Sequence, residues 1–316
     1  MGDGTACHRG VGVGPTGHDT MICMELNHQE ITSPARDAAS VLMLRDGAQG
    51  LEIFMLQRHS NSAVLGGAYV FPGGKLDTAD TELDPHRHLD QARDELHRQL
   101  AEPELDPARA GGLYVAALRE AFEESGILFA QGHGGQAPDA VQAGERLRAG
   151  ASFAQVLGEQ SLQLTTRRLV PWSRWITPKK ASVSTQRFDT RFFVARVCDE
   201  QVARHDDFET TDSVWLTPLQ ALARYAAGEI DLVAPQIMSL YELKTHRTVA
   251  QALEEAARRA PALVEPHPFD EDGVRILCYP GDACHPVPSR AMRGPTRLQL
   301  IEGRFVPVGG MAVLLD

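Results

Sequence analysis

Short apolar runs bounded by turn residues occupy the first quarter of the chain and predict β-strands. Residues 40–45 and 51–58 are two such runs, and the Asp46-Gly47 pair between them is typical of a β-hairpin. A third run, residues 66–71, leads into Pro72-Gly73-Gly74, where glycine lets the backbone approach a ligand closely. The same kind of pattern predicts later strands at 169–176, 188–197 and 214–216.

Apolar residues spaced at helical intervals predict the helices. Around residue 120, Val115, Leu118, Phe122 and Phe129 fall on one side of a helix drawn at about 100° per residue. Other helices are predicted at 89–101, 139–158, from about 218, at 235–246 and at 249–259, and a late β element at 275–279 and 298–308. A few strands followed by a helix, repeated around a small sheet, predict an α+β sandwich.

Three carboxylates lie on the polar side of the central helix. Glu120, Glu123 and Glu124 stand at positions i, i+3 and i+4, so they share one face and repel one another. A divalent cation relieves that repulsion, and hard cations prefer carboxylate oxygen. Arg119 lies one turn before Glu123 and is placed to hold its carboxylate. The pattern predicts a metal site, the alternative being an exposed acidic helix face.

The segment Arg119 to Ile127 resembles the helix of the Nudix hydrolases, whose motif runs G-x5-E-x7-R-E-U-x-E-E-x-G-U, with U apolar. Gly74 fills the opening glycine, and Asp80 stands where the family usually has Glu. Residues 81–118 separate the two halves, which makes 38 residues where the family has seven, an insertion of 31. A motif split in this way resembles the peroxisomal coenzyme A diphosphatase branch. Segments outside the motif add to that likeness: Leu56-Gln57-Arg58, Trp175-Ile176-Thr177-Pro178, Arg187-Phe188-Asp189-Thr190, Trp215-Leu216-Thr217-Pro218 and Ala234-Pro235-Gln236.

The resemblance implies a Nudix α/β/α sandwich with an insertion inside the motif and a C-terminal extension. The predicted division is a disordered leader at 1–33, a Nudix domain at 34–247 with the insertion at 81–112, and an extension at 248–316. The insertion holds eight acidic residues, four arginines and three histidines, so we expect a solvated polar excursion. Its His86 and His88 are weaker candidates as metal ligands.

The resemblance also assigns roles at the site. Gly74, through its carbonyl, and Glu120, Glu123 and Glu124 would hold Mg²⁺ or Mn²⁺, with Glu123 and Arg119 as catalytic residues. Glu209 lies six residues before Trp215 and is a candidate general base or further metal ligand. The alternative for Glu209 is an ordinary surface carboxylate in an acidic run.

The charge of the chain restricts its partners. With 31 Lys and Arg against 42 Asp and Glu, the net charge of −11 disfavours nucleic acid and anionic membranes. No apolar run approaches the roughly 20 residues of a membrane helix. The five cysteines are scattered, odd in number and without a CxxC pair, which indicates reduced thiols and a cytoplasmic protein. Cys278, Cys284 and His285 lack a second ligand pair and do not make a convincing zinc site.

Positive charge is concentrated between residues 161 and 191, where seven cations accompany one acid and give a local charge of +6. Such a window suits a polyanionic ligand such as the adenosine 3′-phosphate of coenzyme A. Arg187 and Arg58 are the candidate substrate-binding cations, with surface positions as the alternative. Phe188, and also Trp175, are candidates to stack on adenine, although aromatic residues in strands more often pack in a core.

These observations predict a metal-dependent diphosphatase that cleaves coenzyme A or acyl-coenzyme A to 3′,5′-ADP and (acyl-)4′-phosphopantetheine. One alternative is a diphosphatase acting on ADP-ribose, NADH or another nucleoside diphosphate derivative. Another is a non-catalytic nucleotide-binding module, although such modules usually lose a metal-binding Glu and this chain keeps all three. The predicted partner is a small-molecule nucleotide, and both a monomer and a homodimer are consistent with the sequence.

Overall fold

A mixed eight-stranded sheet forms the centre of the protein, in the order β10-β7-β8-β1-β2-β3, with β4 paired to β1 and β9 paired to β2. The computed structural model describes residues 27, 29–59, 67–132, 134–181, 185–198, 201 and 210–316. Most of the predicted leader and Glu209 therefore lie outside the described residues. The strands of the sheet are β1 (Arg36–Gly47), β2 (Gly50–Arg58), β3 (Tyr69–Val70), β4 (Gly73–Lys75), β7 (Val170–Ile176), β8 (Phe188–Arg196), β9 (Thr210–Leu216) and β10 (Ala262–Val264).

Both faces of this sheet are covered. Along β1, Val41 and Met43 belong to one hydrophobic cluster, whereas Leu42 and Leu44 belong to another on the opposite face. A strand buried on both faces needs a continuous apolar run, which explains the unbroken Val41–Leu44 segment. The predicted hairpin is confirmed, since β1 and β2 pair antiparallel up to Gly47 and Gly50, and β8 pairs parallel to β1 on the other side.

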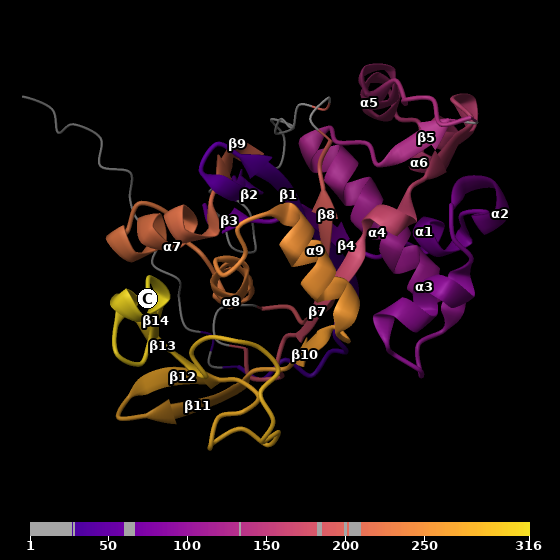
Figure 1. Ribbon diagram of the computed structural model, residues 1–316. Helices are drawn as coiled ribbons and strands as arrows, with labels where there is room; N and C mark the ends of the chain where they lie inside the picture. Colours follow the sequence, from indigo (N-terminus) through magenta and orange to yellow (C-terminus); the bar gives the residue numbers. More distant parts are fainter. Residues whose placement is uncertain are drawn as a thin grey trace, which may run out of the picture.

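The long helix α4 (Pro107–Ser125) covers the first face (Figure 1). Asp106 caps its start by accepting hydrogen bonds from two backbone amides, and Pro107 suits the first turn. Gly126 ends it with a left-handed φ of 72°, so Phe129, predicted on the helix face, lies beyond the helix. Around α4 lie α1 (Thr78–Glu82), α2 (Pro85–His88), α3 (Arg93–Leu100), β5 (Ala130–Gly132), α5 (Ala140–Arg148), α6 (Phe153–Glu159), β6 (Leu162–Leu164) and a 3-10 turn at Thr166–Arg168.

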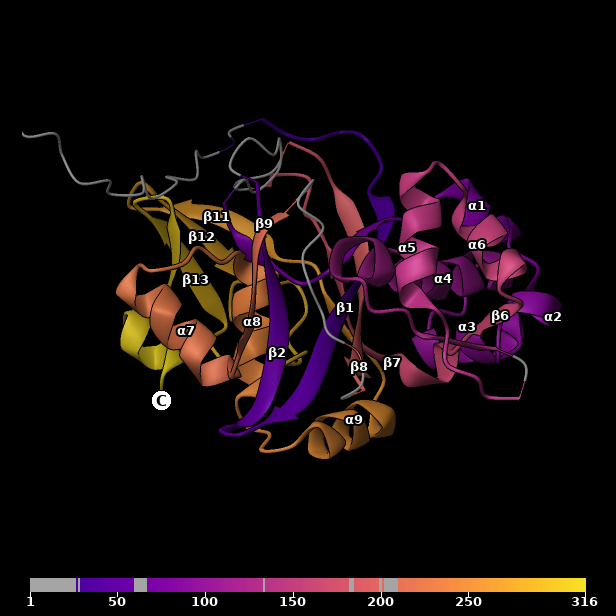
Figure 2. The ribbon, with the colours of Figure 1, turned by 90° about the horizontal axis from the view of Figure 1, so that it is seen from above.

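Helices and a small second sheet cover the other face (Figure 2). The predicted late β element is confirmed as a four-stranded antiparallel sheet in the order β11-β12-β13-β14. Tyr225 joins this C-terminal sheet to the helices, because its hydroxyl donates to the Phe305 carbonyl and accepts from the Phe305 amide, both at 2.9 Å. The elements are α7 (Pro218–Ala227), α8 (Ala234–Leu243), α9 (Val249–Arg258), β11 (His267–Glu271), β12 (Val274–Cys278), β13 (Arg297–Ile301), β14 (Arg304–Pro307) and a 3-10 turn at Met311–Leu314.

Together these layers make an α+β sandwich, as the sequence predicts. Two elements beyond residue 247, α9 and β10, belong to the main sheet and its covering layer, so only the residues from about 267 onward form a separate sheet. Among the described residues, no helix is both long and apolar enough to cross a bilayer.

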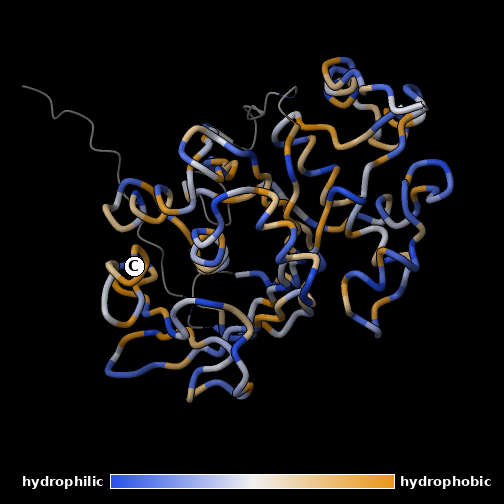
Figure 3. Tube along the Cα trace, in the orientation of Figure 1, coloured by the Kyte–Doolittle hydropathy of each residue, from blue (hydrophilic) through white to orange (hydrophobic). Residues whose placement is uncertain are grey.

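The insertion is not the solvated excursion that its charge predicts. Leu89, Leu96 and Leu100 are buried in the cluster beneath α4, and the predicted insertion runs into α4 itself, which begins at Pro107. Many of its charged residues lie on the outside, although Glu102 turns inward to pair with Arg191, and the turn around α2 is strongly hydrophilic (Figure 3). Charge counting missed the apolar face because a few leucines are enough to anchor a short helix. Two other boundaries differ: α3 starts at Arg93, and residues 139–158 form two helices.

The packing of the insertion predicts a large cost for truncating its core leucine. Leu96→Ala should lower the free energy of unfolding by about 2–5 kcal/mol, because the site is closed on all sides. Leu219→Ala is the matched control, since Leu219 lies on a helix surface and is 47% exposed, and should change stability by about 0.5 kcal/mol or less. Urea unfolding measures both. Equal, small losses would show that the insertion does not contribute to the core.

Candidate active site

Arg119 joins the two halves of the split motif. Its guanidinium donates two hydrogen bonds to the carboxylate of Asp80, both at 2.9 Å, and a third to the Lys75 carbonyl at 3.1 Å. The same side chain reaches forward along α4, where Nη1 donates to Glu120 at 2.7 Å and to Glu123 at 3.1 Å. The predicted contact between Arg119 and Glu123 is therefore present, and Asp80 is the buried counter-ion that anchors the arginine.

The glycine turn lies directly against the carboxylates of α4. The backbone amide of Gly73 donates to Glu124 Oε2 at 2.9 Å, and Glu124 is buried. A side chain at Gly74 would overlap the Glu120 carboxylate, and one at Gly73 would overlap the β1 backbone. Gly73 therefore needs glycine, because the backbone of β1 is too close for a Cβ atom, and a Cβ at position 74 would displace the Glu120 carboxylate.

The donor set fits a hard divalent cation. Carboxylate oxygens from Glu120, Glu123 and Glu124 and the carbonyl-bearing turn at Gly74 are all oxygen donors of the kind such ions prefer. Among the described residues, no three His, Cys, Asp or Glu side chains converge on a single point. Arg119 and the Gly73 amide hold the three carboxylates instead.

Local electrostatics oppose full ionisation at one of these carboxylates. Burial removes water from the Glu123 carboxylate and raises its pKa, and the opposing effect of Arg119 does not cancel that rise. The negative charges of Asp80 and Asp77 add to it. A positive ion at this face would offset the same repulsion.

A cavity of about 690 Å³ opens beside the motif. Gly74, Lys75 and Glu120 line one part of it. Polar residues such as Ser40, Thr190 and Gln236 also line it. Apolar side chains from the main sheet, the start of α8 and the C-terminal sheet contribute as well, namely Val70, Phe71, Phe192, Val233, Pro235, Leu277 and Phe305. The extension thus supplies part of the cavity that adjoins the carboxylates.

The candidate substrate-binding residues occupy different positions around this cavity. Arg58 and Phe188 line it, and Arg58 Nε is buried without a hydrogen-bond partner among the described residues. Arg187 already has partners within the protein. Its Nε donates to the Thr177 carbonyl at 2.8 Å, and its Nη2 lies 3.6 Å from Glu265 Oε1. Trp175 is a core residue that also lines the cavity.

The positive window at residues 161–191 is largely neutralised by its own Asp189 and by acids outside it. Arg191 is buried and pairs with Asp37 and Glu102, each at 2.6 Å. Arg174 pairs with Asp189 at 2.6 Å and with Glu102 at 2.8 Å. Counting charges along the sequence missed these pairs because the acids lie about 70 to 150 residues away, as the separations of 89 and 154 for Arg191 show.

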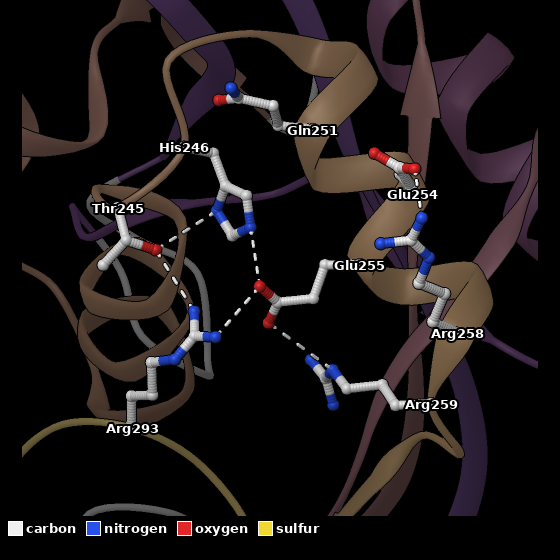
Figure 4. Close-up of a pocket in the computed structure, with 8 residues that line it drawn as sticks. All are labelled: Thr245, His246, Gln251, Glu254, Glu255, Arg258, Arg259 and Arg293. Atoms are coloured by element: carbon white, nitrogen blue, oxygen red, sulfur yellow. Dashed lines mark hydrogen bonds and ion pairs between the residues drawn. The ribbon is translucent and has the colours of Figure 1, made fainter.

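Another hollow, of about 660 Å³, lies at α8 and α9. Several of its charged groups pair with one another, as Figure 4 shows: Glu255 contacts His246 and Arg293, each at 3.0 Å. Arg258 pairs with Glu254. None of the residues that line this hollow belongs to the motif or to the candidate substrate-binding residues.

A family model described as the NUDT19 Nudix domain matches residues 31–244. The chain belongs to the Nudix hydrolases. It is therefore a hydrolase of diphosphate bonds, and Nudix hydrolases generally use divalent metals. Two relatives are each named acyl-coenzyme A diphosphatase NUDT19. The Xenopus laevis protein is 27% identical over 277 residues, covering 74% of this chain and 71% of that protein. The Gallus gallus protein is 29% identical over 309 residues, covering 79% and 80%.

A solved structure agrees with this Nudix assignment. The crystal structure of a Nudix hydrolase from Alicyclobacillus acidocaldarius is similar to the chain with a TM-score of 0.58 and 28% identity. The match covers 71% of this chain and 97% of that one. The Nudix fold is thus shared over most of the described sheet and its helices.

Residue-level reasoning missed two features of this Nudix site. It treated Asp80 as a departure from the motif, whereas Asp80 is the bidentate partner of Arg119. It also left out Leu277 and Phe305, which reach the cavity from the C-terminal sheet. The position of Asp80 in the motif could have indicated its pairing with Arg119. No local sequence pattern indicates that Leu277 and Phe305 line the cavity. The roles assigned to Gly74 and Glu209 stay predictions, and Glu209 lies outside the described residues.

The Arg119–Asp80 pair predicts a strong coupling between the motif halves. Asp80→Asn alone should cost on the order of 3 kcal/mol of stability, because it weakens the pairing of a buried guanidinium. Arg119→Met leaves Asp80 buried and uncompensated and should cost at least as much. The double variant should lose less than the sum of the two, as double-mutant cycles on urea unfolding would measure.

The control for this cycle is Glu159→Gln, which breaks the exposed pair with Arg146 and should leave the unfolding midpoint unchanged. Strict additivity of Asp80→Asn and Arg119→Met would show that the two side chains do not stabilise each other.

Proposed function

We propose that this Nudix hydrolase cleaves the diphosphate of coenzyme A or acyl-coenzyme A, with Mg²⁺ or Mn²⁺, to give 3′,5′-ADP and (acyl-)4′-phosphopantetheine. The observation that carries the proposal is the cavity itself. It begins at Gly74 and Glu120 and continues between apolar side chains of the sheet and the C-terminal sheet. Such a shape suits a diphosphate joined to a long uncharged arm. Two relatives named acyl-coenzyme A diphosphatase support the same substrate class.

The residues of α4 would hold the cation. Glu120, Glu123 and Glu124, with the Gly74 carbonyl, would be its ligands. When bound, a divalent cation neutralises phosphate charge and activates water for attack on phosphorus. Arg119 keeps Glu120 and Glu123 side by side, and the Gly73 amide fixes Glu124. Glu209 remains the candidate general base.

Arg58 and Phe188 would contact the nucleotide. Both line the cavity, and the guanidinium of Arg58 suits a phosphate group, which a guanidinium binds through parallel hydrogen bonds. Arg187 would act beside Phe188 at the adenosine 3′-phosphate. To do so it would have to extend from its present contact with the Thr177 carbonyl.

A substrate panel tests the proposal. Coenzyme A, an acyl-coenzyme A, dephospho-coenzyme A, ADP-ribose and NADH are each incubated with Mg²⁺ or Mn²⁺, and product masses are read by chromatography. We expect 3′,5′-ADP and (acyl-)4′-phosphopantetheine as the preferred products. Turnover of ADP-ribose or NADH without turnover of coenzyme A would refute the proposed substrate.

The same panel separates the roles of the two arginines. Arg187→Ala should raise the KM for coenzyme A about tenfold to a hundredfold more than the KM for dephospho-coenzyme A, because only coenzyme A carries the 3′-phosphate. Arg58→Ala serves as the comparison and should weaken both substrates if it contacts the diphosphate. Equal losses with Arg187→Ala would mean that Arg187 supports the Thr177 segment rather than the phosphate.

Neutralising a helix carboxylate should separate activity from stability. Glu123→Gln and Glu124→Gln should each lower turnover by orders of magnitude, because a cation ligand is lost.

The raised pKa of Glu123 means that this carboxyl stabilises the fold below its unfolded pKa and loses that contribution as the pH rises through the raised value. In chelator at neutral pH, Glu123→Gln should therefore melt at or slightly above the wild-type temperature, and the difference should vanish at low pH.

Glu145→Gln is the control, because Glu145 is an exposed glutamate on α5 and should change neither quantity. Near-native turnover of both helix variants at saturating Mg²⁺ would remove the metal-ligand assignment. A clear drop in melting temperature for Glu123→Gln in chelator would show that its bond to Arg119 outweighs its desolvation.

A further inference from the structure

A cavity of about 1110 Å³ lies beside the C-terminal end of α4, and we call it the α5 groove. Among the described residues, none lines both this groove and the cavity that opens at Gly74. In both ribbon views α5 and α6, which form part of its wall, lie at the opposite end of the molecule from the C-terminal sheet (Figures 1 and 2). The groove still adjoins the motif, because Glu123 lines it.

One side of α5 gives the groove an open apolar surface. Val141, Gly144 and Arg148 lie on that side, because residues three or four positions apart share a helix face. Val141 is 73% exposed, and Gly144 has no side chain to shield it. An exposed apolar surface that borders a hollow of this size is typical of a binding site.

Aromatic side chains extend the apolar surface beyond α5. Phe122 of α4 and Phe153 of α6 line the groove, and their ring centroids lie 6.4 Å apart. Leu128, Phe129 and Leu147 line it as well, together with polar side chains such as those of Gln131 and Gln136. The α5 groove is therefore apolar along several of its elements without being a closed core.

Two arginines line the groove, and neither has an acidic partner among the described residues. Arg148 lies with Nη1 3.5 Å from the place that a Cβ atom on Gly144 would take, so its charge adjoins the apolar side of α5. Arg168 contacts only the neutral thiol of Cys198, at 2.6 Å. By contrast, Arg146 of the same helix does not line the groove and pairs with Glu159.

The acid that lines the groove does not neutralise these arginines. It is Glu123, which already accepts a hydrogen bond from Arg119 at 3.1 Å. The groove thus combines an apolar surface with two cations that lack a counter-charge. That combination complements a molecule with an apolar chain and an anionic head group.

We propose that the α5 groove binds an alkyl carboxylate, with its chain against Val141 and Gly144 and its head group paired with Arg148. A guanidinium binds a carboxylate through two parallel hydrogen bonds, and the chain gains free energy by leaving water. Arg168 adds positive charge to the same groove. This site is separate from the substrate cavity, so the inference does not depend on the proposed function.

Titration calorimetry on the full chain tests the site with three probes. Decanoate carries both the chain and the charge, 1-decanol has the chain alone, and acetate has the charge alone. We expect one decanoate to bind per chain, decanol to bind about tenfold more weakly, and acetate not to bind measurably. Arg148→Gln should weaken decanoate about tenfold and leave decanol unchanged, whereas Val141→Ser should weaken both about tenfold.

The controls replace residues of the same kinds away from the groove. Arg146→Gln removes a cation from the same helix, and Leu219→Ser removes an apolar side chain that is 47% exposed on α7; neither should change any Kd. Three results would overturn the proposal: no measurable binding of decanoate, decanoate binding that neither Arg148→Gln nor Val141→Ser weakens, or equal binding of decanoate and decanol. Both groove positions are exposed, so the melting temperatures of these variants should match that of the wild type.

Discussion

The guanidinium of Arg119 is the interaction on which the site depends. It binds Asp80 from the first half of the motif and Glu120 and Glu123 from the second, although Arg119 and Asp80 lie 39 positions apart in the sequence. Without its charge, a buried aspartate and the glutamates of α4 would face one another with nothing to offset their repulsion. Burial alone would lower the pKa of this arginine, but its carboxylate partners raise it instead. The guanidinium thus keeps the carboxylates together before a cation arrives.

That interaction requires the insertion to be part of the fold. The entropy cost of closing a loop grows only slowly with its length, so a long insertion is tolerated once the fold holds its two ends close together. Here the insertion returns to the sandwich through buried leucines and through Glu102, which pairs with Arg191 and Arg174 on the main sheet. Gly112 in α4 packs so closely on Thr81 that a side chain there would collide with it. The inserted helices therefore position Asp80 and the start of α4 in addition to connecting them.

The sequence predicted the features that depend on neighbours along the chain. The β1–β2 hairpin follows from Asp46-Gly47 between two apolar runs, and the carboxylate face of α4 follows from helical spacing. The contact between Arg119 and Glu123 joins residues one helical turn apart, so helical spacing predicted it as well. What failed depended on distant partners. Arg191 looked like a free cation because Asp37 and Glu102 lie far away in the sequence, and the insertion looked solvated because its charges outnumber its leucines. The sequence around Leu277 and Phe305 does not indicate that these residues line the cavity.

The placement of the C-terminal sheet explains why a protein with a net negative charge can still offer a nucleotide site. The carboxylates of α4 repel a polyanion, and most arginines of the positive window are already paired within the fold. In the proposed function, recognition of the substrate would come from a cation held at α4, from the few cations that line the cavity and from contacts with uncharged groups. The apolar side chains that β12 and β14 contribute increase the last of these, because apolar burial gains free energy without adding charge. In the proposed function, selectivity would then depend on the uncharged arm and on the 3′-phosphate more than on the diphosphate, since every nucleotide diphosphate presents a similar diphosphate to the helix.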